Sequence, residues 1–180
     1  MEKETDFVVI WCKCILFSSY NELNLSVIRM ELTQEIKDYI NKCILCWLAT
    51  SSTEGIPNVS PKEIFTHYEK DKIILANIAS PQTVRNIQQN ENVCLSFIDI
   101  FIQKGFQIKG KAEIIKKTDV EFDGMEKILT KLTDGKFPFS TITKITVHRI
   151  RPIIAPKYVL YPETTEEEQT ASAKKAYGVL

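Results

Sequence analysis

The stretch at residues 73–86, IILANIASPQTVRN, decides the fold. Its first four residues are apolar and predict a buried strand, which a short polar loop joins to a helix. Ser80 suits the position that caps this helix, and Pro81 suits its first turn. Gln82 and Thr83 then lie beside backbone N–H groups that have no partner inside the helix. A phosphate group binds well at such a helix start, so the stretch predicts an anion site.

The composition is that of one folded domain. The chain has 180 residues, of which 44% are hydrophobic and 9% aromatic, and this is enough to build a core. Lys and Arg together number 23, as do Asp and Glu, so the chain carries no overall basic field. Nucleic-acid binding usually needs such a field, so we expect no nucleic-acid partner.

The five cysteines, at positions 12, 14, 43, 46 and 94, are an odd number and too sparse for a secreted disulfide scaffold. They favour a cytoplasmic protein. Cys43 and Cys46 have the spacing of a redox or zinc motif, but they lie in an apolar run, 43–50, that predicts a strand. Residues three apart on a strand point to opposite faces, so we expect two buried, packed thiols.

Residues 1–29 are expected to be a dispensable extension. The apolar run 7–17 is about half the length of a membrane-spanning helix, and the acidic residues before it are wrong for a signal peptide. Met30 is a natural start for the first helix of a domain. Mass spectrometry of the natural protein would test this expectation, which a mature N-terminus at Met1 would contradict.

The rest of the chain alternates short strands with helices. In 106–114 apolar and polar residues alternate, and Gly110 and Ala112 leave the apolar face shallow, which predicts a close backbone approach or a bound ligand. Pro152, Pro156 and Pro162 predict an extended segment without a helix. Strands are expected at 43–50, 57–67, 73–76, 93–98, 106–114 and 141–150, and helices at 33–42, 81–89, 119–132 and 164–177. This pattern predicts an α+β fold, mainly β, in which six antiparallel strands form a barrel with flanking helices.

Several short motifs occur in a recognisable order: LAT at 48–50, GIP at 55–57, VSPKE at 59–63, SPQT at 80–83, RN at 85–86, NV at 92–93 and IKGKA at 108–112. In this order and spacing the chain resembles the pyridoxamine 5'-phosphate oxidase-like family of FMN-binding split barrels. The resemblance covers about residues 32–161. It implies a split-barrel domain at 30–162 followed by a helical tail at 163–180.

The resemblance also implies a homodimer with two FMN sites at the subunit interface. The implied cofactor-binding residues come from two strand ends and a helix start. Ser60, Pro61, Lys62 and Glu63 would line the flavin; Asn77, Ile78, Ala79 and Ser80 would lie beneath the isoalloxazine and ribityl groups; Gln82 and Thr83 would hold the phosphate. Taken alone, Ser80-Pro81 is an ordinary helix start and Lys62 an ordinary surface lysine. Only their combination favours FMN.

The function implied is a flavin-dependent oxidoreductase of unknown substrate, in which the cofactor supplies the redox chemistry. The chain does not resemble the vitamin-forming oxidases at its C-terminus, which argues against pyridoxamine phosphate as substrate. A flavin carrier or sensor without turnover, a binder of haem or of a deazaflavin, and a barrel that only binds other proteins remain alternatives. His67 and His148 lie on separate predicted strands without a partner, so no catalytic residue is assigned, and no membrane or metal is expected.

Overall fold

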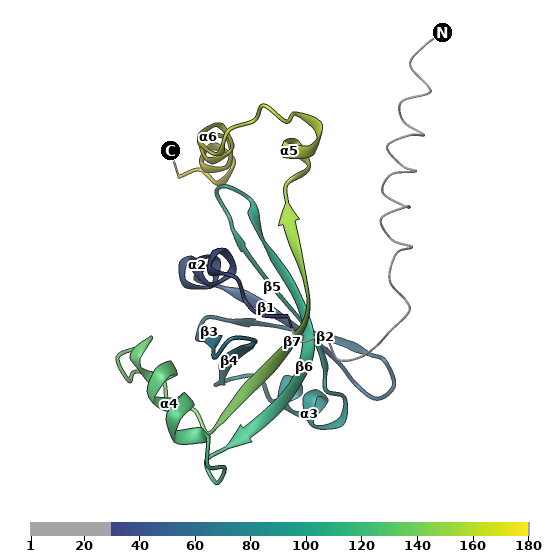
Figure 1. Ribbon diagram of the computed structural model, residues 1–180, viewed down its shortest axis with the longest axis vertical. Helices are drawn as coiled ribbons and strands as arrows, with labels where there is room; N and C mark the ends of the chain where they lie inside the picture. Colours follow the sequence, from purple (N-terminus) through teal and green to yellow (C-terminus); the bar gives the residue numbers. More distant parts are fainter. Residues whose placement is uncertain (1–29, 180) are drawn as a thin grey trace.

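One antiparallel sheet of seven strands forms the body of the computed structural model, which describes residues 30–179 (Figure 1). The strands lie in the order β2-β1-β5-β6-β7-β4-β3. Their bounds are β1 Cys46–Ser51, β2 Pro57–Lys62, β3 Phe65–Tyr68, β4 Lys72–Asn77, β5 Asn92–Asp99, β6 Lys104–Lys116 and β7 Thr141–Ile154. The two edge strands, β2 and β3, follow each other in the sequence. The sheet therefore curls until its edges meet at the bend between Lys62 and Phe65.

This bend corrects the sequence prediction at one point. A single strand was expected at 57–67, but the chain turns at Glu63 and Ile64 and continues on the opposite edge of the sheet. Ala76 in β4 donates its backbone N–H to the carbonyl of Ile64 at 3.0 Å, which holds the bend against the sheet. The fold consequently has seven strands rather than six. The α+β class, the antiparallel pairing and the barrel are confirmed.

The helices lie around the barrel and at its ends (Figure 1). Their bounds are α2 Gln34–Lys42, α3 Pro81–Gln89, α4 Phe122–Lys131, α5 Pro156–Leu160 and α6 Glu166–Tyr177. Tyr39 of α2 packs edge-on against Phe106 of β6, with ring centroids 5.3 Å apart. The strands β6 and β7 form a long antiparallel pair, and α4 lies in the connection between them. Figure 1 shows α4 at one end of this pair and α5 and α6 at the other.

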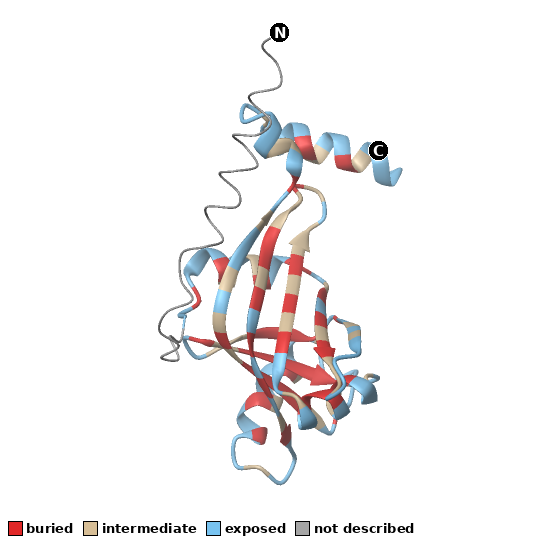
Figure 2. Ribbon diagram, turned by 90° about the vertical axis from the view of Figure 1, so that its right-hand side faces the viewer, coloured by how far each residue is buried: buried red, intermediate tan, exposed pale blue. Residues whose placement is uncertain are grey.

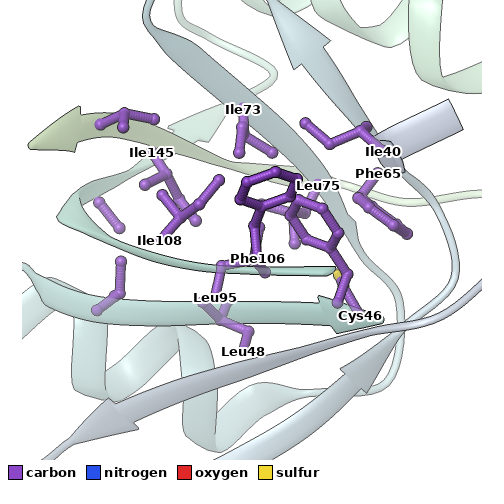
Figure 3. Close-up of a cluster of buried hydrophobic side chains, with 14 of the residues drawn as sticks. Ile40, Cys46, Leu48, Phe65, Ile73, Leu75, Leu95, Phe106, Ile108 and Ile145 are labelled. Atoms are coloured by element: carbon purple, nitrogen blue, oxygen red, sulfur yellow. The ribbon is translucent and has the colours of Figure 1, made fainter. Parts of the chain in front are cut away.

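The core lies inside the curled sheet, as the bands of buried residues in Figure 2 show. Alternate residues of the strands point inward, as their burial pattern requires. Figure 3 shows the main cluster, which includes Leu48, Ile73, Leu75, Leu95, Phe97, Ile108 and Ile145. A second cluster, with Phe122, Met125, Leu129 and Ile142, fixes α4 against β4 and β7. Leu132 follows directly after the end of α4 and is 53% exposed.

Gly110 marks a close approach of two backbones rather than a ligand. The pairing of β6 with β7 shifts between Lys109 and Gly110. A Cβ atom at Gly110 would lie 2.2 Å from the carbonyl oxygen of Thr146, so no larger residue fits. Of the two alternatives that the sequence left open, the structure selects the backbone approach.

The C-terminal region departs from the expected extended segment. β7 continues through Pro152 to Ile154, and α5 then begins at Pro156. Proline is tolerated in the first turn of a helix because its missing N–H would be unpaired there, so the prediction of no helix was wrong. The predicted terminal helix is confirmed: Thr165 and Glu168 form a capping box, and Gly178 ends α6 in a left-handed conformation.

The helix α6 is attached to the tip of the barrel. Lys104 of β6 forms an ion pair with Glu166 at 2.8 Å, and the ring of Tyr177 packs against Phe101 with centroids 6.4 Å apart. The expected domain boundary at 162/163 stays a prediction. The expectation for residues 1–29 lies outside the described residues. Within 30–179, no helix is long and apolar enough to cross a membrane.

Candidate functional site

A pocket of about 760 Å³ opens where β2 and β4 end and α3 begins. The bend after β2 brings the two strand ends together, since it carries the chain from one edge of the sheet to the other. Residues on the β2 side include Ser60, Pro61, Lys62 and Glu63, and those on the β4 side include Ile78, Ala79 and Ser80. The sequence had assigned all of these to a flavin site, and the structure places them around one cavity.

Lys62 is the most unusual residue of this pocket. It is the last residue of β2 and points inward, so that it is only 6% exposed. Its ammonium group donates to Asn77 Oδ1 at 3.3 Å and to the Ser80 hydroxyl. Among the described residues, no carboxylate lies within ion-pair distance of it. Burial lowers the pKa of Lys62 below its usual value, and the nearby Cys46 thiol opposes this effect.

Asn77, at the end of β4, lies behind the lysine and is almost fully buried. Its Oδ1 accepts hydrogen bonds from Lys62 and, at 3.1 Å, from the Thr143 hydroxyl. Its Nδ2 is buried without a hydrogen-bond partner within the described part of the chain. An unpaired buried donor is costly. Asn77 does not itself line the pocket and is connected to it through Lys62.

Beneath the pocket, a network of short polar side chains connects β1, β2 and α3. The hydroxyls of Ser60 and Thr83 share a hydrogen bond, and Asn58 donates to Thr83 Oγ1 at 3.3 Å and to Thr50 Oγ1 at 3.2 Å. Asn86 donates to the same Thr50 oxygen at 3.1 Å. Thr83 is fully buried, so its side chain is committed to this network. The network fixes the start of α3 relative to β2.

The helix α3 begins where the sequence predicted, with Pro81 in its first turn. Ser80 occupies the N-cap position, but its side chain makes no capping hydrogen bond and instead accepts one from Lys62. The prediction that Ser80 caps the helix is therefore correct for its position and wrong for its hydrogen bond. The first-turn N–H groups keep no side-chain cap, and of residues 80–83 only Ser80 lines the pocket.

Gln82 and Thr83 do not line the pocket. The Gln82 amide donates to Asn86 Oδ1 at 2.7 Å and accepts from the Arg85 guanidinium at 2.8 Å. Arg85 thus adds a cation near the helix start that was not assigned to the site, although its i+3 spacing from Gln82 places both on one side of the helix. Asn58 was also missed, because its contact with Thr83 joins residues that are distant in sequence.

The cysteine motif is structural. Cys43 ends α2 instead of lying in the strand, which was predicted to start there and starts at Cys46. Both thiols are buried in the same hydrophobic cluster, and burial raises the pKa of Cys43 to about 11 and that of Cys46 further. Neither is bonded in a disulfide. Among the described residues, no group of His, Cys, Asp or Glu is arranged to hold a metal ion.

The two histidines of the chain lie apart, His67 on β3 and His148 on β7. Neither lines the pocket, which thus offers haem iron no imidazole ligand. Burial lowers the pKa of His67, with a smaller contribution from Lys37.

The curled antiparallel sheet with flanking helices is a split barrel. The sequence matches the family described as pyridoxamine 5'-phosphate oxidase over residues 32–153, and the chain belongs to this family. No curated protein matches the sequence.

Solved structures share the fold. HupZ of Group A Streptococcus is similar to the chain with a TM-score of 0.57 and 28% identity, over 67% of this chain and 98% of HupZ. An FMN-binding protein from Syntrophomonas wolfei subsp. wolfei is similar with a TM-score of 0.59 and 16% identity, over 84% of this chain and 97% of that protein. The haem storage protein HutZ from Vibrio cholerae is similar with a TM-score of 0.52 and 17% identity, over 69% of this chain and 95% of HutZ. The last two similarities concern the fold alone.

Proposed function

We propose that the chain binds FMN in the pocket beside Lys62 and acts as a flavin-dependent oxidoreductase. The observation that carries the proposal is the buried ammonium group of Lys62, which has no carboxylate partner among the described residues. Burying an unpaired cation is costly, and an anionic ligand removes most of that cost. The phosphate of FMN is such an anion.

The residues present fit the cofactor. Lys62 and the Ser80 hydroxyl both line the pocket and offer donors to a phosphate from one corner of it, and the uncapped start of α3 follows directly after Ser80. Asn77 lies behind Lys62 and positions its ammonium group through a hydrogen bond to Oδ1. Ser60, Pro61 and Glu63 on one side, with Ile78 and Ala79 on the other, form the walls available to the flavin. Gln82 and Arg85, hydrogen-bonded to each other, lie outside the pocket lining, and Thr83 supports the lining residue Ser60 through a hydrogen bond.

Bound FMN would supply hydride or electron transfer, while the protein orients the cofactor and its substrate. Lys62 would hold its proton in the complex, because a neighbouring phosphate stabilises the charged form. The Ser80 hydroxyl, now an acceptor from Lys62, would remain fixed by that bond and direct its own proton to the ligand. No side chain in this proposal transfers a proton to the substrate.

The proposal includes a homodimer, in the cytoplasm, with an FMN site at each end of the interface. On the outer surface of the sheet, Trp47 is 47% exposed and stands opposite Pro61, and Val59 beside them is 56% exposed. This apolar surface continues directly into the pocket through Pro61. Exposed apolar patches of this kind mark contacts between proteins.

The test is a comparison of FMN with riboflavin, which lacks the phosphate. We expect Lys62→Met to weaken FMN binding by about 1.5 to 3 kcal/mol, the contribution of a charged hydrogen bond, and to leave riboflavin binding nearly unchanged. Lys117→Met removes an exposed lysine distant from the pocket and is the control. Equal FMN affinity in the wild type and Lys62→Met would overturn the proposal.

A further inference from the structure

The pocket has a second wall that the residues assigned to FMN do not form. Two connections build this wall: the turn between α2 and β1, with Ile44, and the loop between α4 and β7, with Leu132 and Phe137. Neither connection belongs to the strand ends around Lys62. They face the part of the cavity that extends away from the start of α3.

Large apolar side chains are exposed on this wall. Ile44 is 84% exposed, Leu132 53% and Phe137 52%. Single exposed apolar residues are common on protein surfaces, but three that line one cavity are a preferred surface for an apolar ligand. The opposite corner, with Lys62 and Ser80, is polar. The cavity thus has a cationic corner and an apolar wall.

The charged residues of this wall neutralise each other. Asp134 and Lys136 lie 3.9 Å apart, and both line the pocket. The two residues are largely exposed, and together they leave this wall without net charge. The electrostatics of this end favour a neutral ligand, in contrast to the corner at Lys62.

The loop that carries Phe137 is held in place by its own hydrogen bonds. The backbone N–H of Gly135 donates to the carbonyl of Thr130 at 3.1 Å, and that of Lys136 donates to Thr133 at 3.0 Å. Asp134 and Gly135 have φ angles of 50° and 74°, so the chain reverses sharply after α4. This turn presents Phe137 to the cavity without a separate ordering step.

We propose that this wall, Ile44, Leu132 and Phe137, binds the substrate of the flavin site, and that the substrate is an uncharged, planar aromatic compound. The inference rests on the proposed function, since the FMN corner would place the redox centre beside the wall. The flat face of Phe137 and the branched side chains beside it would stack on and cover a planar ring. The pairing of Asp134 with Lys136 would disfavour charged analogues.

The experiment is a titration of the purified, FMN-loaded protein with 2,3-dimethyl-1,4-naphthoquinone, followed by equilibrium dialysis. This probe is planar and uncharged, and its substituted quinone ring does not alkylate thiols. We expect saturable binding that Phe137→Ala and Leu132→Ala each weaken by roughly tenfold, with FMN content unchanged. The matched control is Val120→Ala, which removes an exposed valine that does not line the pocket. We expect 2-naphthoate, a charged ring of similar size, to bind more weakly than the quinone.

Any one of these results would overturn the inference: quinone affinity unchanged in both wall variants, equal losses in Val120→Ala, or tighter binding of 2-naphthoate. A wild-type protein without FMN would refute the proposed function separately, and the same titration of that protein would still measure quinone binding to the wall. If a wall variant lost FMN together with the quinone, the wall would belong to the cofactor site and the inference would fail. Circular dichroism of each variant verifies that it is folded.

Discussion

At the scale of single residues, the ligand-free protein stores an unfavourable interaction at Lys62. The ammonium group is buried against hydroxyl and amide oxygens, which compensate a charge less well than a carboxylate does. The same feature that destabilises the ligand-free protein favours an anion in the pocket. Function and stability therefore oppose each other at this position.

Replacing this lysine should stabilise the ligand-free protein. Burial lowers the pKa of Lys62 in the folded state, so the unfolded chain binds the proton more tightly. The free energy of unfolding of the wild type relative to Lys62→Met should therefore rise with pH from the lowered pKa up to the usual value of 10.5. Below this window the variant should be the more stable protein. Urea unfolding at several pH values measures the difference.

Lys117→Met provides the baseline for that measurement. Lys117 is exposed in the folded protein as well as in the unfolded chain, so its replacement involves no change in burial. Other lysines, such as Lys72 and Lys144, have raised pKa values and change the stability of all three proteins equally. Only the difference between the wild type and each variant is informative. A difference that does not change with pH would contradict the account of Lys62.

The cysteines should differ in reactivity in the folded protein. Cys43 and Cys46 are buried with raised pKa values, while Cys94 is partly exposed. Because the thiolate is the reactive form, brief iodoacetamide treatment at pH 8 should modify Cys94 and spare the other two. Peptide mass spectrometry reads each site, and treatment in urea should label all three. Labelling of Cys43 before Cys94 under native conditions would be inconsistent with this structure.

The residues of the site were only partly visible in the sequence. Lys62, Ser80 and the strand residues around them follow the family pattern, and the fold places them on one cavity. Asn58 was not predictable, since its role depends on Thr83, which lies in a distant element. The sequence also could not show that Ser80 serves Lys62 instead of capping its helix. Contacts between distant residues depend on how the strands pair. The helix and strand preferences of neighbouring residues do not reveal this pairing.

At the scale of elements, short sequence patterns predicted a helix or strand correctly where the residues of that element alone determine it. Proline at the start of α3 and the alternation in β6 placed these two elements correctly. The bend between β2 and β3 was missed because the run 57–67 contains no glycine, although its apolar alternation breaks at Glu63. Lys62 before the bend and Ile64 and Phe65 after it are buried by other parts of the barrel. The position at which β2 ends therefore depends on tertiary packing.

Two glycines should respond in opposite directions to replacement by alanine. At Gly110 the added Cβ would meet the Thr146 carbonyl at 2.2 Å, so we expect Gly110→Ala to destabilise the protein by about 3 kcal/mol or more. Gly124 lies in α4 with nothing within 4 Å of such a Cβ, and Gly124→Ala should stabilise by about 0.5 to 1 kcal/mol. Thermal unfolding of both variants tests this. Similar effects at the two positions would show that the β6–β7 approach is wrong.

At the scale of the whole molecule, the barrel leaves an apolar surface on the outside of β1 and β2. Trp47 and Val59 lie on this surface, and the pocket begins beside it at Pro61. A second copy placed there would cover apolar area and close one side of the cavity. Dimerisation and cofactor binding would then depend on the same face.

Trp47→Glu should consequently yield a monomer that has also lost FMN affinity, because burying a carboxylate in an apolar interface is unfavourable. Sedimentation equilibrium measures the mass, and a flavin titration measures the affinity. Val120→Glu, on an exposed residue outside β1 and β2, should leave both unchanged. A Trp47→Glu protein that remained a dimer would place the interface elsewhere.

The visible absorption spectrum of the full chain, purified without added cofactor and passed through gel filtration, tests the central claim most directly. The account predicts the two bands of oxidised flavin, and FMN released into the filtrate on denaturation, at one molecule per chain. A deazaflavin or haem spectrum would contradict the choice of cofactor. A colourless protein that takes up no FMN when it is supplied would contradict the account as a whole.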